Sequence, residues 1–442
     1  MQRHLALVLA ALTAAWLVSL PAGTLAAIGE PGGLWRLRGT LILGTGYLAI
    51  TTMSLAMILA ARPVRLETLL GGLDQFYRLH KRLGITGALL GLVHWLLEIV
   101  PKWMVGQGWL VRPPRRAGGA AASTEPFKAW EGLAKELGEW GLYLVLALVV
   151  VALWKRIPYR YFAKLHRVLP AAYLLLAFHS IVFMPVGYWT ALAGPLAALL
   201  IAGGVVAAAL SLTGRIGFTR RALGHVDSLK LHEDRVLEVH CQLDTPWAGH
   251  QSGQFVFVTF DEREGAHPFT VVSAWRGDGH LVLAIKGLGD YTSALPSRLA
   301  LGAAVTVEGP YGRFNFAGKR ARQIWVAGGI GITPFISRLE WLAHNAAQHQ
   351  AIDLFYSANE SNEILLSRLR ELAAQAGVKL HVIITPRDPL LTVERLAQVV
   401  PDHASAEVWF CGPIKFGESL RQGLRQLGLP ADCFHQETFE MR

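Results

Sequence analysis

The chain has 442 residues, which is long enough for two or three domains. Apolar residues make up 52% of it and charged residues only 17%, which is unusual for a wholly soluble protein. The apolar residues fall in blocks of about twenty before residue 215 and alternate with charged residues after it. The three cysteines (Cys241, Cys411 and Cys433) do not make a disulfide framework and favour a reducing compartment for this second half. The net charge is +10, and the sequence combines it with long apolar spans and no basic low-complexity tail. This charge therefore indicates membrane topology, and we expect no nucleic-acid partner.

A bilayer core about 30 Å thick requires about twenty apolar residues per helix. The sequence predicts six spans, at residues 5–27, 40–61, 83–101, 139–154, 168–189 and 192–213. The first resembles a secretory signal peptide, because Arg3 and His4 precede its apolar run and TLAA follows it. Its apolar run is longer than a signal peptide usually carries, and five more spans follow, so we expect this helix to be retained.

The charges of the loops predict the orientation of the six spans. The loops on one side contain fourteen lysines and arginines, and those on the other side contain eight. Because cytoplasmic loops carry the excess of positive charge, we expect both termini to lie in the cytoplasm. The second half of the chain would then be cytoplasmic, beneath a plasma or inner membrane.

Two of the predicted helices each carry two histidines. His80 and His94 are fourteen residues apart, so they lie about 21 Å apart along a helix and within about 40° of the same face. His166 and His179 are thirteen residues apart, which would leave them about 140° apart on an ideal helix. Pro170 lies between them and can kink the helix or reset its phase.

These four histidines form two levels across the membrane. His80 and His166 are expected near the cytoplasm, and His94 and His179 near the outer face. Imidazole suits iron, facing helices build cofactor sites from inward side chains, and polar residues inside membranes are costly unless functional. We therefore expect each level to ligate one haem iron. The alternative is that the histidines are hydrogen-bonded or interfacial, with the inner two extending toward water.

From about residue 216, GQFVFVTF, HLVLAIKGLGDYTSAL and AAVTVEGPYGRFNF predict β-strands with alternating apolar positions. From IWVAGGIGITPF onward, strands alternate with helices, which predicts a parallel nucleotide-binding sheet. Gly328, Gly329 and Gly331 end a strand and open a helix. Glycines at such a place let a pyrophosphate approach the backbone N–H groups of the helix terminus. The same glycines can also serve only a tight turn.

Five motifs in order carry a resemblance to a known superfamily. HPFTVVSA (267–274) resembles the flavin-binding stretch of ferredoxin reductase-type proteins, and GLGDYT their flavin-diphosphate segment. AGGIGITP, CGP and HQETFEMR resemble the nicotinamide turn, the nicotinamide-side motif and the C-terminal segment. The histidine spacings match those of the ferric reductase and NADPH oxidase flavocytochromes. The chain thus resembles this superfamily over nearly its whole length.

The resemblance implies three domains. The first is a six-helix transmembrane haem-binding bundle at residues 1–215. The second, at 216–318, is an antiparallel β-barrel that binds FAD. The third, at 319–442, is an α/β Rossmann-like domain that binds NAD(P).

The resemblance also implies a set of site residues. Those expected to line the isoalloxazine are Pro268, Phe269, Thr270 and Ser273. Those expected at the FAD diphosphate are Gly289, Tyr291 and Thr292. Those expected to hold the nicotinamide nucleotide are Gly328, Gly329, Gly331, Thr333 and Pro334, with Cys411, Gly412 and Pro413 beside the nicotinamide. The catalytic candidates are Thr270, Cys411 and Phe439. The ring of Phe439 would cover the flavin. Thr270 can instead be a strand-end threonine and Cys411 a small core residue, and three residues follow Phe439 where the oxidases typically stop.

The implied activity is electron transfer from cytosolic NADH or NADPH, through FAD and two b-type haems, to an acceptor on the outer face. The implied partners are membrane lipid, the nicotinamide nucleotide and that acceptor, which is a ferric chelate, a quinone, oxygen or a protein. Glu98 stands where oxidases typically carry another histidine, which counts against a dedicated oxygen reductase. The stretch FYSANESNE lacks an arginine and favours NADH. A membrane-anchored flavin reductase and an electron-delivery subunit are the alternatives.

Overall fold

The computed structural model describes residues 2–63, 66, 70, 72–111, 127–154, 156–157, 159–345, 350–385 and 387–436. The chain divides between Ile216 and Gly217 into two compact units. The first unit is helical. The second contains an antiparallel barrel and a parallel sheet covered by helices.

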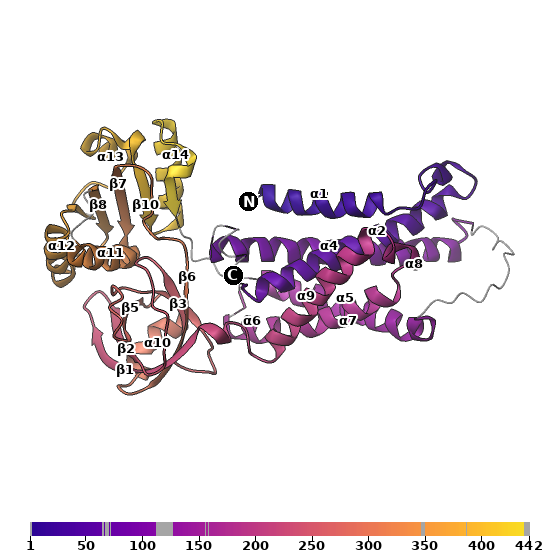
Figure 1. Cartoon of the computed structure of the whole chain (residues 1–442), viewed down its shortest axis with the longest axis horizontal. Coiled ribbons are helices and arrows are strands. Elements are labelled where there is room, and N and C mark those ends of the chain that lie inside the picture. The colour runs from indigo at the N-terminus through magenta and orange to yellow at the C-terminus, as the bar shows by residue number, and fades with distance from the viewer. Residues whose placement is uncertain are drawn as a thin grey trace. The chain divides into compact units, whose positions relative to one another are not determined.

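The helices of the first unit follow the predicted apolar blocks (Figure 1). They are α1 (Gln2–Val18), α2 (Gly33–Ala60), α4 (Leu73–Gly106), α5 (Glu131–Leu153), α6 (Tyr159–His166), α7 (Leu169–Val182), α8 (Val186–Trp189) and α9 (Ala193–Leu212). Within the described ranges, five helical stretches are long and apolar enough to cross a membrane: α2, most of α4, α5 with the turn before it, α6 with α7, and α9. These five correspond to the second to sixth predicted spans.

The first predicted span is shorter than expected. The sequence predicted a helix over 5–27, but α1 has 17 residues and ends at Val18, ahead of Pro21, which lacks a backbone donor. Its Leu12 and Trp16 are buried among the other helices, and Trp16 Nε1 donates a hydrogen bond of 3.1 Å to the Tyr188 hydroxyl. This helix belongs to the bundle, although its length alone does not make it a span.

The fifth predicted span is interrupted rather than kinked. The helix ends at His166 and a new helix begins at Leu169, with Pro170 in its first turn. Proline is favoured there because its missing N–H has no partner in a first turn anyway. The turn between α6 and α7 resets the helix phase, so the angle of an unbroken helix does not separate His166 from His179.

The second unit begins with the barrel. Its elements are β1 (Arg221–Leu231), β2 (Val236–Leu243), β3 (Phe255–Thr259), β4 (His267–Thr270), β5 (His280–Lys286), α10 (Asp290–Arg298) and β6 (Ala304–Tyr311). The six strands lie in the order β4-β3-β6-β1-β2-β5, all antiparallel neighbours. A bridge between Val271 and Leu283 brings the two outer strands together, so the barrel is nearly closed. Alternate residues of β2 are buried, as the period of a strand requires.

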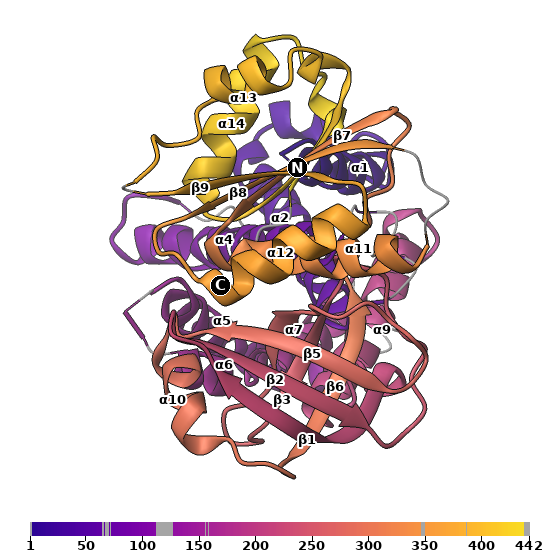
Figure 2. The same cartoon turned by 90° about the vertical axis from the view of Figure 1, so that its left-hand side faces the viewer.

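The parallel sheet completes the second unit. Its elements are β7 (Arg322–Gly328), α11 (Thr333–His344), β8 (Ala351–Ala358), α12 (Glu363–Gln375), β9 (Lys379–Ile384), α13 (Val393–Val399), β10 (Glu407–Cys411), α14 (Ile414–Gln426) and β11 (Phe434–Gln436). The strand order is β11-β10-β7-β8-β9, and each neighbouring pair is parallel. Figure 2 shows α11 and α12 on one face of this sheet and α13 and α14 on the other. The order reverses between β7 and β10, which is where such folds bind nucleotides.

Candidate functional site

The structure brings the four membrane histidines together as two facing pairs. The ring centroids of His80 and His166 are 6.1 Å apart, with their planes 68° apart. Those of His94 and His179 are 6.2 Å apart, with their planes at 90°. The pairs are those that the sequence predicted, one from α4 and one from α6 or α7 at each level.

The separation of each pair suits a single metal between the rings. A histidine nitrogen binds a transition metal at about 2.0–2.1 Å, so two imidazoles on opposite sides of one ion have ligand nitrogens about 4 Å apart and ring centroids roughly 6 Å apart. The two observed separations, 6.1 and 6.2 Å, match this value. Direct packing of the imidazoles would not require two levels to repeat the same spacing.

The second ring nitrogen of three of these histidines is held by a backbone carbonyl. Nδ1 of His80 lies 2.8 Å from the carbonyl oxygen of Ala56. Nδ1 of His94 lies 2.9 Å from that of Ile42, and Nδ1 of His179 lies 2.9 Å from that of Ala134. A histidine that donates Nδ1–H to a carbonyl keeps the Nε2 lone pair for a metal, and this arrangement is typical of metal ligands. The Nδ1 atom of His166 is buried, with no partner in the described parts of the chain.

Two glycines make room for the outer histidines. A Cβ on Gly138 would overlap the His179 ring, and one on Gly46 would lie 3.1 Å from the His94 ring. Each glycine lies one turn after the carbonyl that holds its histidine, Ala134 in α5 and Ile42 in α2. A side chain at such a position covers the carbonyl of the preceding turn, so both glycines keep an acceptor open. Sequence reasoning missed these glycines, because their role depends on which helix packs against which.

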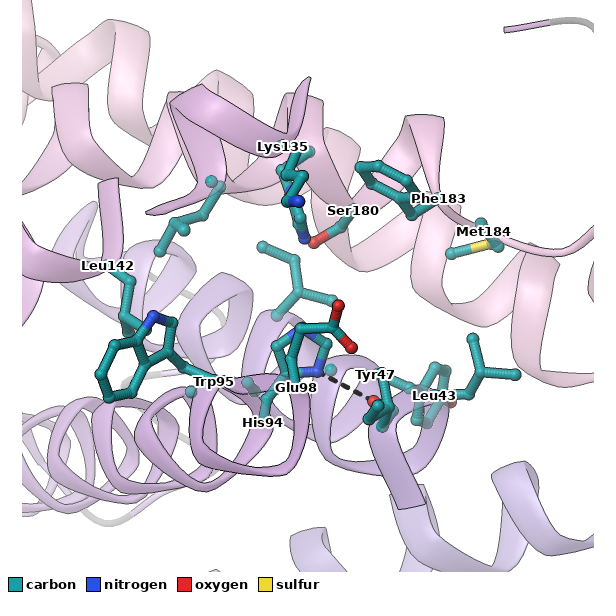
Figure 3. A pocket seen from close by; sticks show the side chains of 18 of the residues that line it. Leu43, Tyr47, His94, Trp95, Glu98, Lys135, Leu142, Ser180, Phe183 and Met184 are labelled. Atoms are coloured by element: carbon teal, nitrogen blue, oxygen red, sulfur yellow. Dashed lines mark hydrogen bonds between the residues drawn. The ribbon is translucent and has the colours of Figure 1, made fainter. Parts of the chain in front are cut away.

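A cavity of about 420 Å³ surrounds the outer pair. Figure 3 shows Tyr47, His94 and Glu98 on one side of it, opposite Lys135 and Ser180. Tyr47 is only 5% exposed, and its hydroxyl has no hydrogen-bond partner in the described structure. Buried hydroxyls normally have one, so a polar group of a bound molecule would satisfy it. The histidine pair, the glycines and this hydroxyl fit a haem in the cavity.

Glu98 lies one turn beyond His94 and is not free to act as a ligand. Its two carboxylate oxygens pair with Arg38 of α2 and Lys102 of its own helix. Arg38 also donates from Nε to the carbonyl of Leu97 at 2.8 Å. One side of the cavity is therefore lined by a carboxylate held between two cations.

In the second unit, the predicted flavin residues line one edge of the barrel. Pro268, Phe269 and Thr270 lie in β4 and are half-buried, with Thr270 opposite Phe255 of β3. Ser273 is buried, and its hydroxyl accepts a hydrogen bond of 3.1 Å from the backbone N–H of Val282. The Ser273 hydroxyl thus has a structural partner in addition to its expected place near the flavin.

The predicted diphosphate segment lies beside this edge. The ring of Tyr291 in α10 stacks on the His267 ring of β4 with centroids 4.3 Å apart. Burial raises the pKa of Tyr291 to about 12. The Thr292 hydroxyl lies 3.1 Å from the backbone N–H of Gly289, the N-cap of α10. A helix N-terminus attracts anions through its unpaired N–H groups, and the residues predicted for the diphosphate lie at the start of α10.

The two predicted nicotinamide motifs contact each other through their backbones. A Cβ on Gly331 would overlap the Cys411 carbonyl, and one on Gly328 would lie 2.7 Å from the Pro413 ring. A Cβ on Gly412 would lie 3.0 Å from the Gly328 backbone. Because β7 and β10 are neighbours, the turns that follow them meet at the carboxyl edge of the sheet. These glycines therefore serve close packing between the turns.

The remaining residues of these motifs complete the edge. Gly329 has φ +55°, a conformation that glycine adopts without strain. Thr333 and Pro334 begin α11, and Cys411 is buried at the end of β10. Phe439, the predicted cover of the flavin, lies outside the described residues.

Sequence profiles of three families match the chain in order. A ferric reductase like transmembrane component matches residues 45–177, an FAD-binding domain matches 224–315, and an oxidoreductase NAD-binding domain matches 325–422. The chain has the ferric reductase/NADPH oxidase-type architecture. The chain is a membrane-linked oxidoreductase module with FAD-binding and NAD(P)H-binding domains.

Individual curated relatives match less than half of the chain, at 25% and 29% identity. The stachydrine N-demethylase reductase subunit of Rhizobium meliloti (strain 1021) is 25% identical over 205 residues, which are 43% of this chain and 58% of that protein. The ferredoxin reductase component of 3-ketosteroid-9-alpha-monooxygenase from Mycobacterium tuberculosis (strain CDC 1551 / Oshkosh) is 29% identical over 197 residues, 42% of this chain and 54% of that protein. The chain spans little more than half the length of these curated relatives. A flavohemoglobin structure from Malassezia yamatoensis has a TM-score of 0.47 at 17% identity, covering 91% of this chain and 97% of that one.

Proposed function

We propose that the chain is a flavocytochrome b that transfers electrons from cytosolic NADH or NADPH, through FAD and two b-type haems, to an acceptor on the outer face of the plasma or inner membrane. The observation that carries this proposal is the pair of facing histidines at each of two levels. Their ring centroids are 6.1 Å apart at one level and 6.2 Å apart at the other. Electron transfer of this kind needs redox centres at two depths of the bilayer, and each histidine pair would hold one haem.

The protein residues have three tasks in this function. When bound, FAD would convert a two-electron donor into single-electron steps, and the haems would carry these across the membrane. His80 and His166 would hold the inner haem and His94 and His179 the outer one. The β4 edge and the start of α10 would bind FAD, and the turns after β7 and β10 would orient the nicotinamide nucleotide. We assign these tasks to residues 1–215, 216–318 and 319–442 respectively.

The catalytic candidates would act at the flavin and nicotinamide. Thr270 would place its hydroxyl near the reactive flavin nitrogen, Cys411 would border the nicotinamide, and Phe439 would cover the flavin until nicotinamide replaces it. The excess of lysines and arginines on one side supports a cytoplasmic location for all three. The cations around Glu98 and the cavity at the outer pair support an acceptor site at the other side.

Visible spectra of membranes that contain the chain test this proposal. Adding NADH, then NADPH, then dithionite should produce sharp reduced b-type haem bands, and the nicotinamide nucleotide that first produces them identifies the donor. Bands with a nicotinamide nucleotide would establish the electron path. Absence of haem bands even with dithionite would contradict the proposal and leave a membrane-anchored flavin reductase.

A second function is favoured by the curated relatives, which are reductase components of monooxygenases and demethylases. In this case the chain would deliver electrons to a protein partner rather than reduce a small acceptor itself. The purified chain would then show haem and FAD and accept electrons from nicotinamide, but it would reduce ferric chelates, quinones and oxygen slowly. Fast turnover with one of these small acceptors would exclude the delivery role.

Replacing Gly138 with alanine should weaken the outer haem site about tenfold or more, because loss of the support of a ligand histidine typically costs this much in metal affinity. The added methyl group would overlap the His179 ring and separate it from the Ala134 carbonyl. Haem content per chain and a haem titration measure this effect. Gly132→Ala in the same helix is the control, because its Cβ would meet nothing within 4 Å. Equal haem binding by the two variants would contradict the role of Gly138.

A further inference from the structure

Within the second unit, a single carboxylate joins the flavin-binding edge to the nicotinamide helix. Glu340 lies in α11, which begins at the nicotinamide turn. One of its carboxylate oxygens accepts a hydrogen bond of 3.0 Å from the backbone N–H of Ala274. Ala274 ends the stretch HPFTVVSA, four residues after Thr270. The two segments expected to hold the reacting rings are therefore connected by this carboxylate.

The other oxygen of Glu340 is held by a cation from the next helix. Arg368 of α12 donates from Nη2 to Glu340 at 2.7 Å. Its Nη1 atom lies 3.9 Å from the carboxylate of Glu238, which belongs to β2 of the barrel. Arg368 thus lies between a carboxylate of the nicotinamide domain and one of the barrel. Its side chain is 38% exposed and that of Glu340 only 13%, so water screens this interaction on one side only.

Glu238 is itself fixed on the barrel by two histidines. His240 Nε2 lies 2.8 Å from one oxygen, and His232 Nε2 lies 2.9 Å from the other. The hydrogen bonds from His240 and His232, together with the charge of Arg368, lower the pKa of Glu238 to about 2. Glu238 is therefore a charged anchor for Arg368 throughout the neutral range.

A second contact lies one turn earlier in the same helix. The Ser337 hydroxyl of α11 donates a hydrogen bond of 2.9 Å to the carbonyl of Ser273. The Ser252 hydroxyl donates a hydrogen bond of 2.9 Å to the carbonyl of Ser337. Successive turns of α11 thus contact successive residues of the flavin stretch. Such a contact fixes the helix in translation as well as in angle.

We propose that Glu340 and Arg368 are positioning residues for hydride transfer, which hold the nicotinamide helix against the flavin stretch in the reacting alignment. This inference rests on the proposed function. In the step concerned, one hydride, which carries two electrons, leaves the nicotinamide and joins the flavin, so the nucleotide is oxidised and the flavin is reduced. Displacing two reacting rings by about 1 Å can lower such a rate about a hundredfold.

The test compares four variants of the full chain. Glu340→Ala removes the acceptor for Ala274 N–H and the partner of Arg368, whereas Glu340→Gln keeps an oxygen for the amide and loses the charge. Arg368→Ala removes the cation. Arg370→Ala is the matched control, because Arg370 lies on the same helix and pairs only weakly, at 3.8 Å, with the exposed Glu363 of α12. FAD content and melting temperature are recorded for every variant.

Anaerobic stopped-flow measurement of flavin reduction gives the limiting rate and the nucleotide Kd separately. We expect Glu340→Ala and Arg368→Ala to lower the limiting rate about tenfold to a hundredfold, with Kd changed less than about threefold. Glu340→Gln should recover part of the rate, and Arg370→Ala should match the wild type. Hydrogen–deuterium exchange at the Ala274 amide should speed up about tenfold in Glu340→Ala and little in Glu340→Gln, because only the alanine leaves this N–H without its acceptor.

Unchanged limiting rates in Glu340→Ala and Arg368→Ala, with FAD content intact, would overturn the inference. Unchanged exchange at Ala274 in Glu340→Ala would overturn it as well. Failure of a nicotinamide nucleotide to reduce the flavin of the wild-type chain would instead count against the proposed function. The exchange experiment needs no turnover, so it distinguishes the two failures.

Discussion

Replacing His94 with alanine is expected to remove about half of the haem from the chain. The two histidine pairs lie on separate levels of the bundle, and each histidine ring of α4 faces one histidine ring of α6 or α7. Loss of one ligand should empty the outer site, because the remaining His179 offers a single bond to the iron, while the inner pair is unaffected. Extracted haem per chain and the dithionite-reduced spectrum measure the loss, and the remaining band should belong to the inner haem alone.

The other histidines supply the controls for this experiment. His80→Ala should also remove about half of the haem, but its remaining band should be that of the outer haem. Replacing both His80 and His94 should remove all of it. His225→Ala should leave the haem content unchanged, because His225 lies in β1 of the second unit and forms an exposed pair with Asp244. Full haem content in His94→Ala would mean that the outer pair does not bind haem.

For the first unit, the sequence predicted the helices and also which histidines face each other. Apolar blocks predict spans because a bilayer sets their length, and the spacing of His80 and His94 follows from helix geometry. The interruption between His166 and Leu169 could not be predicted, because Pro170 indicates only some change of direction. The sequence placed the end of α1 too late, at residue 27. The apolar residues that follow Val18 continue the apolar pattern, but the helix ends at Val18.

The second half was predicted through its motifs, but the contacts between them were not. Alternating strands and helices with glycines after β7 indicate a nucleotide-binding sheet whatever the rest of the chain does. The contact of Gly331 with Cys411 requires that β7 and β10 be neighbours, and these strands are far apart in the sequence. The link from Glu340 to Ala274 likewise joins residues 66 positions apart. Local patterns carry no information about which partners such residues meet.

Replacing Gly331 with alanine is expected to lower haem and flavin reduction by nicotinamide about a hundredfold. The new methyl group would overlap the carbonyl of Cys411, so the turn after β7 must move away from the turn after β10. Both turns are expected to hold the nicotinamide, and overpacking of this kind costs about 1–3 kcal/mol even where the fold survives. Reduction of the flavin and of the haems by NADH or NADPH, followed at their separate absorbance bands, measures the effect.

Dithionite separates this effect from loss of the fold, because it reduces haem without a nucleotide site. In Gly331→Ala, dithionite should still reduce the full complement of haem, FAD content should equal that of the wild type, and only the nicotinamide-driven rate should fall. The deficit should be the same for the inner and outer haem, since the change lies upstream of both. A variant that keeps its nicotinamide rate would show that the two turns can separate without harm, and the nucleotide would then have to bind elsewhere than at the carboxyl edge between β7 and β10.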